Sequence, residues 1–374
     1  MARRKQLKGL TSIRFFLCLL VVIMHCSQNL KGFNIMWGSG APILQKGGLA
    51  VDYFFVLSGF LLTYLAFCEY KANGKIRIRA FFLRRILRIF PLYYLAVFLG
   101  YFTLGILYPM FRNKSYLSFS ISEGLPYHLL FLPNWISAKY LDGVGSLYGL
   151  WSLGVEEQFY LFFPFLCILF FRRKPIVYFG IASVSYLLFY NYFQANFPTR
   201  LTDEYRQFAY TLRFHYMLMG GFYGLIFVQY RELFSALFSR KILQLFVLIL
   251  FLFTIFTSLS PFRHEVVHAS IFCLLLISLT NESQTSLYPN SKFLRHLGSI
   301  SFGIYVYHGL VSYPLRYSLE ISPNSFAIIS QVPVIYYLLE ISLTILISHL
   351  SYVHYEQKFL KLKSKFTPVR VDQK

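Results

Sequence analysis

Apolar stretches of about 20 residues recur along the whole chain, and they constrain the fold more than any other feature of the sequence. A helix needs about 20 such residues to cross the hydrocarbon layer of a membrane. The sequence therefore predicts an all-α, polytopic integral membrane protein with about ten transmembrane helices. We place them at residues 10–30, 48–68, 90–111, 147–171, 175–193, 208–229, 242–259, 266–280, 298–315 and 331–353.

The composition and the charge distribution agree with a membrane-embedded chain. Of the 374 residues 56% are hydrophobic and 14% are charged, whereas a soluble domain carries about a quarter charged residues. The net charge of +21 would suggest nucleic acid as a partner of a soluble chain. With a cytoplasmic N-terminus, however, 25 of the 36 Lys and Arg residues fall on the cytoplasmic side and 10 on the other. This asymmetry follows the positive-inside rule, so we expect both termini in the cytoplasm and no nucleic-acid partner.

The N-terminal segment and the cysteines do not indicate another class of protein. The basic start and the apolar run after it resemble a signal peptide, but no small-x-small cleavage site follows. The five cysteines show neither a metal-binding nor a disulfide spacing, so we expect packing roles and no metal site. We divide the chain into a membrane domain, residues 1–357, and a basic cytoplasmic tail, residues 358–374.

Ionisable side chains within the predicted spans are costly in lipid, which makes each of them a candidate functional residue. Arg14 and His25 are eleven residues apart, so they share a face of the first helix at roughly 16 Å separation. Asp52 begins the second helix at a depth comparable to that of His25, and its carboxylate is expected to orient the imidazole. The alternatives are a snorkelling Arg14, a structural His25 and an Asp52 that only favours the helix dipole.

A basic segment between the second and third helices holds seven Lys and Arg residues. Arg85 and Arg88 lie on one face of the chain there, just before the membrane. Arginine suits bidentate phosphate recognition, so this pair favours a phosphate-bearing cytoplasmic ligand. The alternative is a plain positive-inside anchor.

The fourth predicted helix carries a polar stripe. Ser152, Glu156 and Tyr160 follow one another at four-residue intervals and therefore share a face. Because Glu156 and Glu157 occur together inside a span, at least one of them should face a protein or water-filled interior. His308, in the ninth helix, stands alone among small residues, and we expect a structural role for it.

Six segments, taken in order, resemble the membrane acyltransferase family 3, whose members O-acylate carbohydrates at the cell envelope. The segments are Arg14 with ten residues before His25, VDYFFVLSGFL, RRILRIFPLYY, WSLGVEEQFYLFFP, SFGIYVYHGL and SYVHYEQKFL. They run from the first helix to the tail, so the resemblance covers nearly the whole chain. One departure is the absence of the usual Pro after His308, which leaves the role of that histidine open.

The resemblance implies a ten-helix core in the cell (inner or plasma) membrane that transfers an acyl group from cytoplasmic acyl-CoA to a hydroxyl of an extracytoplasmic glycan. Acetyl is the expected group, and O-antigen, capsule and peptidoglycan are candidate acceptors. The implied catalytic residues are His25, its motif partner Arg14, Asp52 and Glu156; the donor-binding residues are Arg85 and Arg88; the substrate contacts are Trp151, Ser152 and Tyr160. His25 would act as a general base or as a transient acyl carrier, and both routes stay open.

Two further expectations concern partners and alternatives. Some members of the family append a soluble hydrolase-like domain, which this chain is too short to include, so the acceptor is expected to be served by the membrane core or by a separate partner protein. A secondary transporter is the main alternative, because buried ionisable residues also mark ion pathways. The lack of repeat symmetry between the two halves of the sequence argues against it, and a structural scaffold would leave the intramembrane charges unexplained.

Overall fold

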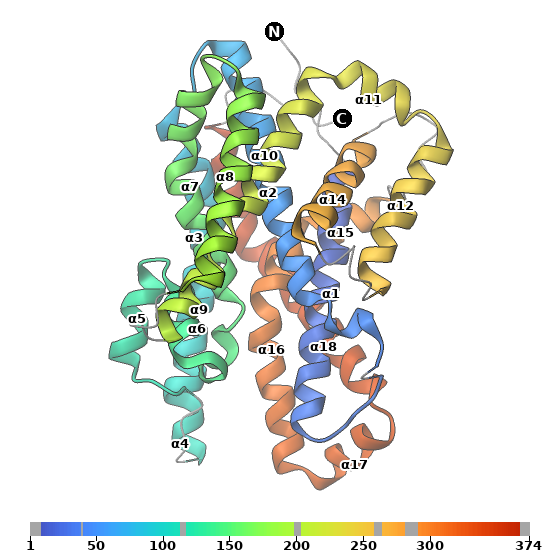
Figure 1. The fold of residues 1–374 in the computed structure, drawn as a ribbon. Coiled ribbons are helices and arrows are strands. Elements are labelled where there is room, and N and C mark those ends of the chain that lie inside the picture. Colours follow the sequence, from blue (N-terminus) through green and yellow to red (C-terminus); the bar gives the residue numbers. More distant parts are fainter. Residues whose placement is uncertain are drawn as a thin grey trace.

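A computed structural model describes residues 9–38, 40–112, 117–197, 203–257, 264–280 and 291–366. Every element assigned in these ranges is helical, which confirms the predicted all-α class. Figure 1 shows long helices running side by side, with the short helices α4 (Tyr108–Arg112), α5 (Ile121–Leu129), α6 (Pro133–Tyr140) and α17 (Pro323–Gln331) gathered toward one end.

Six helical runs in the described ranges are long and apolar enough to cross a membrane, so the chain is a multi-pass membrane protein. They are α1 (Gly9–Gly32), α2 (Gly47–Asn73), Ile78–Met110 including α3 (Ile78–Gly100), Val144–Phe171 including α7 (Leu150–Phe171), α8 (Pro175–Ala195), and Val334–Lys363 including α18 (Val334–Ser351). A seventh is added if α11 (Arg231–Leu237) and α12 (Lys241–Phe256), which are bent by 93° to each other, form one span.

The remaining predicted spans are helical but shorter, broken or less apolar. The range 208–229 is divided at Leu212 and Arg213 into α9 (Asp203–Thr211) and α10 (Phe214–Gln229). The ranges 266–280 and 298–315 contain α14 (Glu265–Leu279) and α16 (Ser301–Ile321). The total of ten spans therefore stays a prediction. The other described elements are η1 (Pro42–Gln45), η2 (Tyr101–Leu107), η3 (Leu141–Leu147), α15 (Lys292–Ser299), η4 (Tyr352–Glu356) and α19 (Gln357–Ser364).

Helix α2 is the centre of the bundle and packs against α1, α7, α10 and α14. Its contact with α10 is close because each helix places a glycine against the backbone of the other. A Cβ atom at Gly59 would clash with the backbone of Met217, and one at Gly220 would clash with the backbone of Val56. Small residues allow this approach where lipid provides no hydrophobic drive for association. Side chains of α2 therefore contact helices on several sides, α1, α7, α10 and α14.

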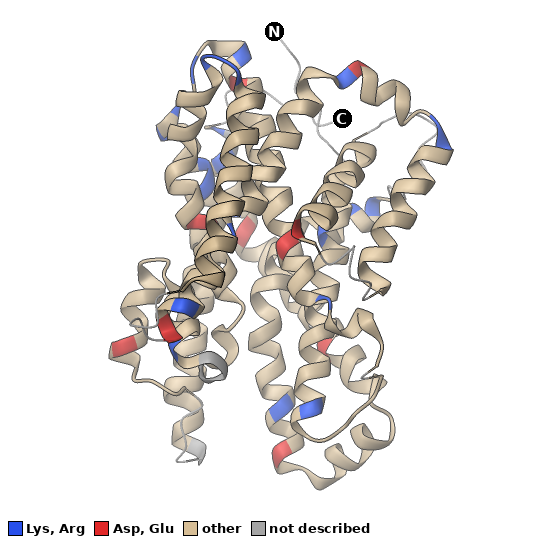
Figure 2. Cartoon of the chain, in the orientation of Figure 1, with Lys and Arg blue, Asp and Glu red and all other residues tan. Residues whose placement is uncertain are grey.

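The basic connections lie at one end of the molecule. Figure 2 shows Lys and Arg along the connections after α2, α7 and α11, at the end opposite to α4 and α17. These connections were predicted to be cytoplasmic, and their common end agrees with the predicted alternation of spans. Which end faces the cytoplasm, and the placement of both termini there, stay predictions.

Candidate functional site

A cavity of about 410 Å³ lies between α1, α2, α3, α7 and α16. Its volume is within the range of small-molecule sites, about 300–1,000 Å³. The cavity brings together six of the predicted site residues, from three different helices. They are Arg14 of α1, Arg85 and Arg88 of α3, and Ser152, Glu156 and Tyr160 of α7.

Three half-buried arginines, Arg14, Arg85 and Arg88, face the cavity together with the Glu156 carboxylate. None of the ion pairs among the described residues involves these arginines, and the Arg85 Nε atom is buried without a hydrogen-bond partner there. The Arg85 guanidinium lies 5.5 Å from the centre of the Tyr160 ring, which favours a fixed orientation of its planar fork. Half-buried guanidinium groups without a direct ion pair attract anions and match carboxylate or phosphate oxygens in geometry, so this wall of the cavity is suited to an anionic ligand.

Glu156 is held by two hydroxyl groups. Ser58 Oγ of α2 donates to Glu156 Oε1 at 2.7 Å, and Tyr160 OH donates to Oε2 at 2.9 Å. Both carboxylate oxygens are therefore accounted for, and the side chain is fixed on the cavity wall. Ser152 Oγ lies 2.5 Å from Tyr305 OH of α16. The polar stripe of α7 thus forms hydrogen bonds with α2 through Glu156 and with α16 through Ser152.

Two neighbours of the stripe lie outside the cavity. Trp151 packs edge-to-face against Phe55 at 6.2 Å between ring centres and is absent from the cavity lining. Phe55 does line the cavity, and the predicted substrate contact by Trp151 stays a prediction. Glu157 has one buried carboxylate oxygen with no hydrogen-bond partner among the described residues.

Charged residues near the basic connections line one end of the cavity. Arg84 Nη2 donates to Glu69 Oε2 at 3.0 Å, and the Arg77 amide donates to Glu69 Oε1 at 3.1 Å. Lys363 of α19 also lines this end. The segment predicted as a basic tail therefore contributes to the cavity, in a helical run that continues from α18 to Lys363.

His25 lies beyond the opposite end of the cavity. Cys18 of α1 lines the cavity, and His25 follows about two turns, or about 10 Å, later. On α16, Tyr305 lines the cavity and His308 follows one turn later. The His25 ring centre is 5.3 Å from that of His308 and 4.3 Å from that of Tyr148. His308 is thus a neighbour of the predicted catalytic residue, although the sequence favoured a purely structural role.

Hydrogen bonds orient both imidazole rings. His25 Nδ1 lies 2.9 Å from Gln28 Oε1. An amide oxygen only accepts, so this contact places the proton on Nδ1 and leaves Nε2 with a free lone pair. His308 Nδ1 donates to the Tyr305 carbonyl at 2.5 Å, and His308 Nε2 is buried without a partner in the described ranges.

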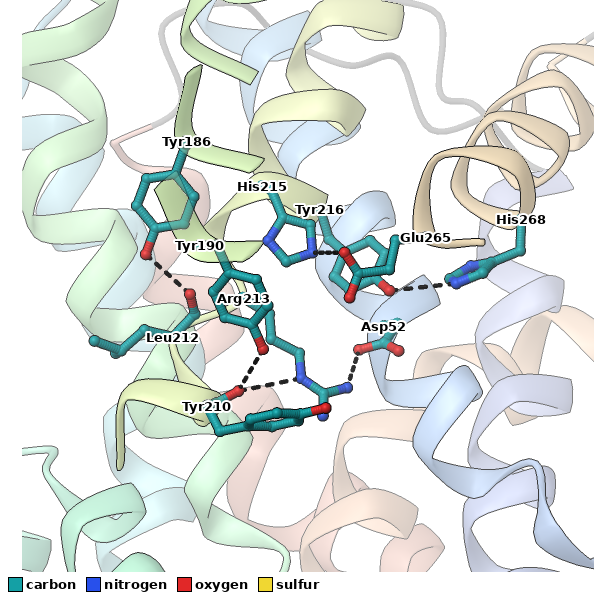
Figure 3. Close-up of polar contacts among 10 residues, drawn as sticks. All are labelled: Asp52, Tyr186, Tyr190, Tyr210, Leu212, Arg213, His215, Tyr216, Glu265 and His268. Carbon is teal, nitrogen blue, oxygen red and sulfur yellow. Dashed lines mark hydrogen bonds and ion pairs between the residues drawn. The ribbon is translucent and has the colours of Figure 1, made fainter. Parts of the chain in front are cut away.

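Asp52 does not orient His25, and this prediction is corrected by the structure. Arg213 Nη1 donates to Asp52 Oδ1 at 2.9 Å, and the Asp52 side chain is 9% exposed (Figure 3). Asp52 therefore faces the start of α10 and not His25. Depth in a span can be read from sequence position, whereas the facing between two helices depends on how they pack.

The Asp52–Arg213 pair belongs to a polar network at the break between α9 and α10 (Figure 3). Tyr186 OH and Tyr190 OH of α8 donate to the carbonyls of Leu212 and Tyr210, at 2.9 and 3.0 Å. These carbonyls would lack partners where the helix is interrupted, so the two tyrosines satisfy them within the protein.

The same network extends to α14. His215 Nε2 lies 3.5 Å from Glu265 Oε2, and Tyr216 OH lies 3.3 Å from His268 Nε2. The ionisable residues of the sixth and eighth predicted spans are therefore explained by contacts between helices.

Three site residues were not anticipated. Gln28 follows His25 by about one helical turn, and this spacing alone would have indicated that the two side chains can meet. Ser58 gave no signal, because a hydroxyl inside a span is ordinary. Tyr148 contacts His25 from η3–α7, a long-range packing that local sequence does not encode. Within the described residues no three His, Cys, Asp or Glu side chains converge to hold a metal, and a metal-free site stays a prediction.

Comparisons with known proteins add to this geometry. Residues 7–353 match the family of acyltransferase domains. The chain is 26% identical over 370 residues to the peptidoglycan O-acetyltransferase OatA of Listeria monocytogenes serovar 1/2a, covering 91% of this chain and 55% of that protein. It is 26% identical over 375 residues to the O-acetyltransferase OatA of Staphylococcus aureus, covering 93% and 56%. The chain thus spans little more than half the length of these relatives. No solved structure matches it.

Proposed function

The chain belongs to this acyltransferase family, which confirms the resemblance seen in its motifs, and on that premise we propose that it moves an acetyl group from cytoplasmic acyl-CoA to a hydroxyl of an extracytoplasmic envelope glycan. Two relatives are named O-acetyltransferases, and the one from Listeria acts by name on peptidoglycan. The observation that carries the proposal is the cavity lined by three half-buried arginines that form no direct ion pair, with His25 about two helical turns beyond its end. We place the enzyme in the cell (inner or plasma) membrane.

The donor would enter from the end of the cavity that holds Arg84 and Lys363. Its phosphate groups would bind the forks of Arg85 and Arg88, because guanidinium groups match phosphate oxygens in geometry and charge. The extended thiol arm would then follow the cavity along α1, past Cys18, toward His25. Arg14, on the same face of α1, supplies positive charge along this path.

His25 Nε2 serves either of two routes. As a general base it accepts the proton of the glycan hydroxyl while the oxygen attacks the thioester carbonyl, and the C–S bond breaks to release the coenzyme thiolate. As an acyl carrier it attacks the thioester itself, releases the thiolate, and passes the acyl group to the hydroxyl in a second step. In the first route the imidazolium returns the hydroxyl proton to the thiolate. In the second route the hydroxyl loses its proton as it attacks the acyl-imidazole, and this proton neutralises the thiolate released in the first step, so both routes end with the free thiol and the glycan ester.

The donor site is tested by titrating acetyl-CoA against purified protein in nanodiscs. Arg88→Lys keeps the charge but loses the planar fork, so we expect weaker binding, and Arg85→Gln/Arg88→Gln should weaken it further and make it less salt-sensitive. Arg79→Gln, in the same basic segment but outside the cavity lining, is the matched control. Equal donor affinities in all four proteins would leave these arginines as topology anchors.

The chemistry is tested by His25→Ala. Transfer to glycan should be lost while acetyl-CoA still binds, because the arginines are untouched. Incubation of wild-type protein with labelled acetyl-CoA and no glycan separates the routes: label retained on His25 supports the acyl carrier, and unlabelled protein supports the general base. Transfer at the wild-type rate by the variant would reject the assignment of His25.

A further inference from the structure

We infer that the acceptor glycan binds between α4 and α16, in an outer cleft formed by Tyr108, Tyr313, Arg316, Tyr317 and Glu320. This cleft lies on the side of His25 that faces away from the arginine-lined cavity. The inference rests on the proposed function, because it names where the second substrate of that reaction would bind.

The position follows from the two helices that carry the histidines. Arg316 is eight residues beyond His308 on α16, about 12 Å along the axis. On α1, Gly32 is seven residues beyond His25 and shares its face. Arg316 Nη2 lies 3.9 Å from the point that a Cβ of Gly32 would occupy. The guanidinium therefore meets α1 two turns past His25, in the direction opposite to Cys18 and the donor cavity.

The face of α1 between His25 and Arg316 carries an exposed polar residue. Gln28, which accepts the hydrogen bond from His25, is exposed, and it lies between His25 and Gly32 on the same face of α1. The Arg316 guanidinium lies 5.8 Å from the centre of the Phe33 ring, just past the end of α1. A ligand held at Arg316 thus has a route to the catalytic imidazole along one helix face.

The chemistry of the cleft suits a sugar. Tyr108 of α4 and Tyr317 of α16 meet edge-to-face at 5.1 Å between ring centres. Together with Tyr313, Arg316 and Glu320 they line a small hollow of about 10 Å³, room for about one hydroxyl or water. Arg316 Nε lies 3.6 Å from Glu320 Oε1, and their side chains are 42% and 29% exposed. Aromatic faces beside a donor–acceptor pair match a polyol, whose hydroxyls both donate and accept.

The competing occupant is a phospholipid headgroup, because Arg and Tyr are common at membrane interfaces. An anionic headgroup fits poorly, since Glu320 lies beside Arg316 and offsets its charge. An uncharged sugar is compatible with both members of the pair. We therefore assign the cleft to the glycan, and lipid becomes an outcome of the test.

The experiment measures acetyl transfer in nanodiscs against the concentration of envelope glycan, extracted from cells that lack the gene and stripped of esters with alkali. Arg316→Gln, Glu320→Gln and Tyr317→Phe are compared with wild type. Loss of one hydrogen bond to a charged group costs about 1.5–3 kcal/mol, so we expect the KM for glycan to rise about tenfold or more in the two charge variants. Acetyl-CoA affinity, measured separately, should not change. Lys31→Gln, an exposed cation at the same end of α1, is the matched control.

The outcomes separate the two proposals. Wild-type protein that binds acetyl-CoA but acetylates none of the extracted glycan rejects the proposed function, and the inference with it. Wild-type transfer with an unchanged glycan KM in all three variants rejects the inference alone. A rise in KM that appears only in discs containing anionic lipid, and vanishes in neutral lipid, assigns the cleft to headgroups and also overturns it.

Discussion

Gln28 controls which nitrogen of His25 is available for chemistry. Its amide oxygen is 2.9 Å from His25 Nδ1, and it comes from the next turn of the same helix, so the pair is held by local geometry. A neutral amide orients the ring without adding a second charge to the membrane interior, where each charge is costly. This differs from the carboxylate–histidine arrangement expected from Asp52.

Substitutions at Gln28 should therefore act on turnover. We expect Gln28→Ala to lower kcat about tenfold, the equivalent of one net hydrogen bond of about 1.4 kcal/mol, because the imidazole is no longer fixed in one tautomer. Gln28→Glu, which keeps an acceptor in place, should retain more activity than Gln28→Ala. The measurement is kcat for glycan acetylation, with acetyl-CoA affinity as the check on folding. A changed donor affinity with unchanged kcat would contradict the positioning role.

Asp52 shows how far a single residue can be interpreted from sequence. Its presence in a span marked it as significant, and the structure agrees, since it forms a buried ion pair. Its partner was not predictable, because Arg213 is 161 residues away and its position depends on a helix break. By contrast, Arg14 and Glu156, predicted as catalytic, and Arg85 and Arg88, predicted as donor-binding, line one cavity, and their roles stay predictions.

Loss of the Asp52–Arg213 pair should mainly affect stability. Removing one member of a buried pair costs about 3–5 kcal/mol, and the lower end applies here because Arg213 is 25% exposed. We expect Asp52→Asn and Arg213→Gln each to lower the melting temperature in detergent, and the double variant to lose less than the sum. Asp203→Asn, in an exposed pair on α9, is the control. A fully additive double variant would mean that the pair contributes no coupling.

At the scale of elements, helix α5 depends on a buried histidine. His128 has no exposed surface and lies outside the candidate spans. Its Nδ1 is 3.0 Å from Tyr101 OH and 3.1 Å from the Gly124 carbonyl. Tyr93 OH donates to its backbone carbonyl at 2.8 Å. These contacts connect α5 to the long helical run that begins with α3.

The α5 region should loosen in acid. Burial lowers the pKa of His128 from 6.5 to about 4, so the folded state favours the neutral ring. This contribution to stability is complete above pH 6.5 and is lost as the pH falls from about 6.5 to about 4, because the unfolded region takes up a proton first. We expect the protection factors of the amides in residues 121–130, which are corrected for the intrinsic pH dependence of exchange, to fall over this window in wild type and to stay nearly constant in His128→Asn. Equal pH dependence in both proteins would exclude His128 as the cause.

Elements were predictable where they are long and apolar. Each predicted span contains a helix, because about 20 consecutive apolar residues specify one whatever surrounds them. The break at Leu212 and Arg213 was not predictable, because its exposed carbonyls are satisfied by Tyr186 and Tyr190 from another helix. The short span predicted at 266–280 is a 15-residue helix, and sequence alone does not say whether such a helix crosses the bilayer.

At the scale of the whole molecule, the predicted orientation can be measured directly. Asn73 ends α2 at the basic end, and Asn196 follows α8 at the opposite end of its helix; both are exposed. We expect Asn196→Cys to react with an impermeant maleimide on intact cells, and Asn73→Cys only after permeabilisation. Four of the five native cysteines are buried, so wild type provides a low background. Labelling of Asn73→Cys from outside would invert the topology and separate the arginines from cytoplasmic acyl-CoA.

The cavity stops about two helical turns short of His25, and this gap bears on what leaves the cell. In the proposed reaction the coenzyme enters and returns on the cytoplasmic side, so that only a two-carbon unit passes the imidazole. The narrow thiol arm has to enter this gap, whereas the bulky nucleotide end of the coenzyme stays on its cytoplasmic side. A cell would thus decorate an external polymer while keeping its nucleotide pool and its ion gradients intact.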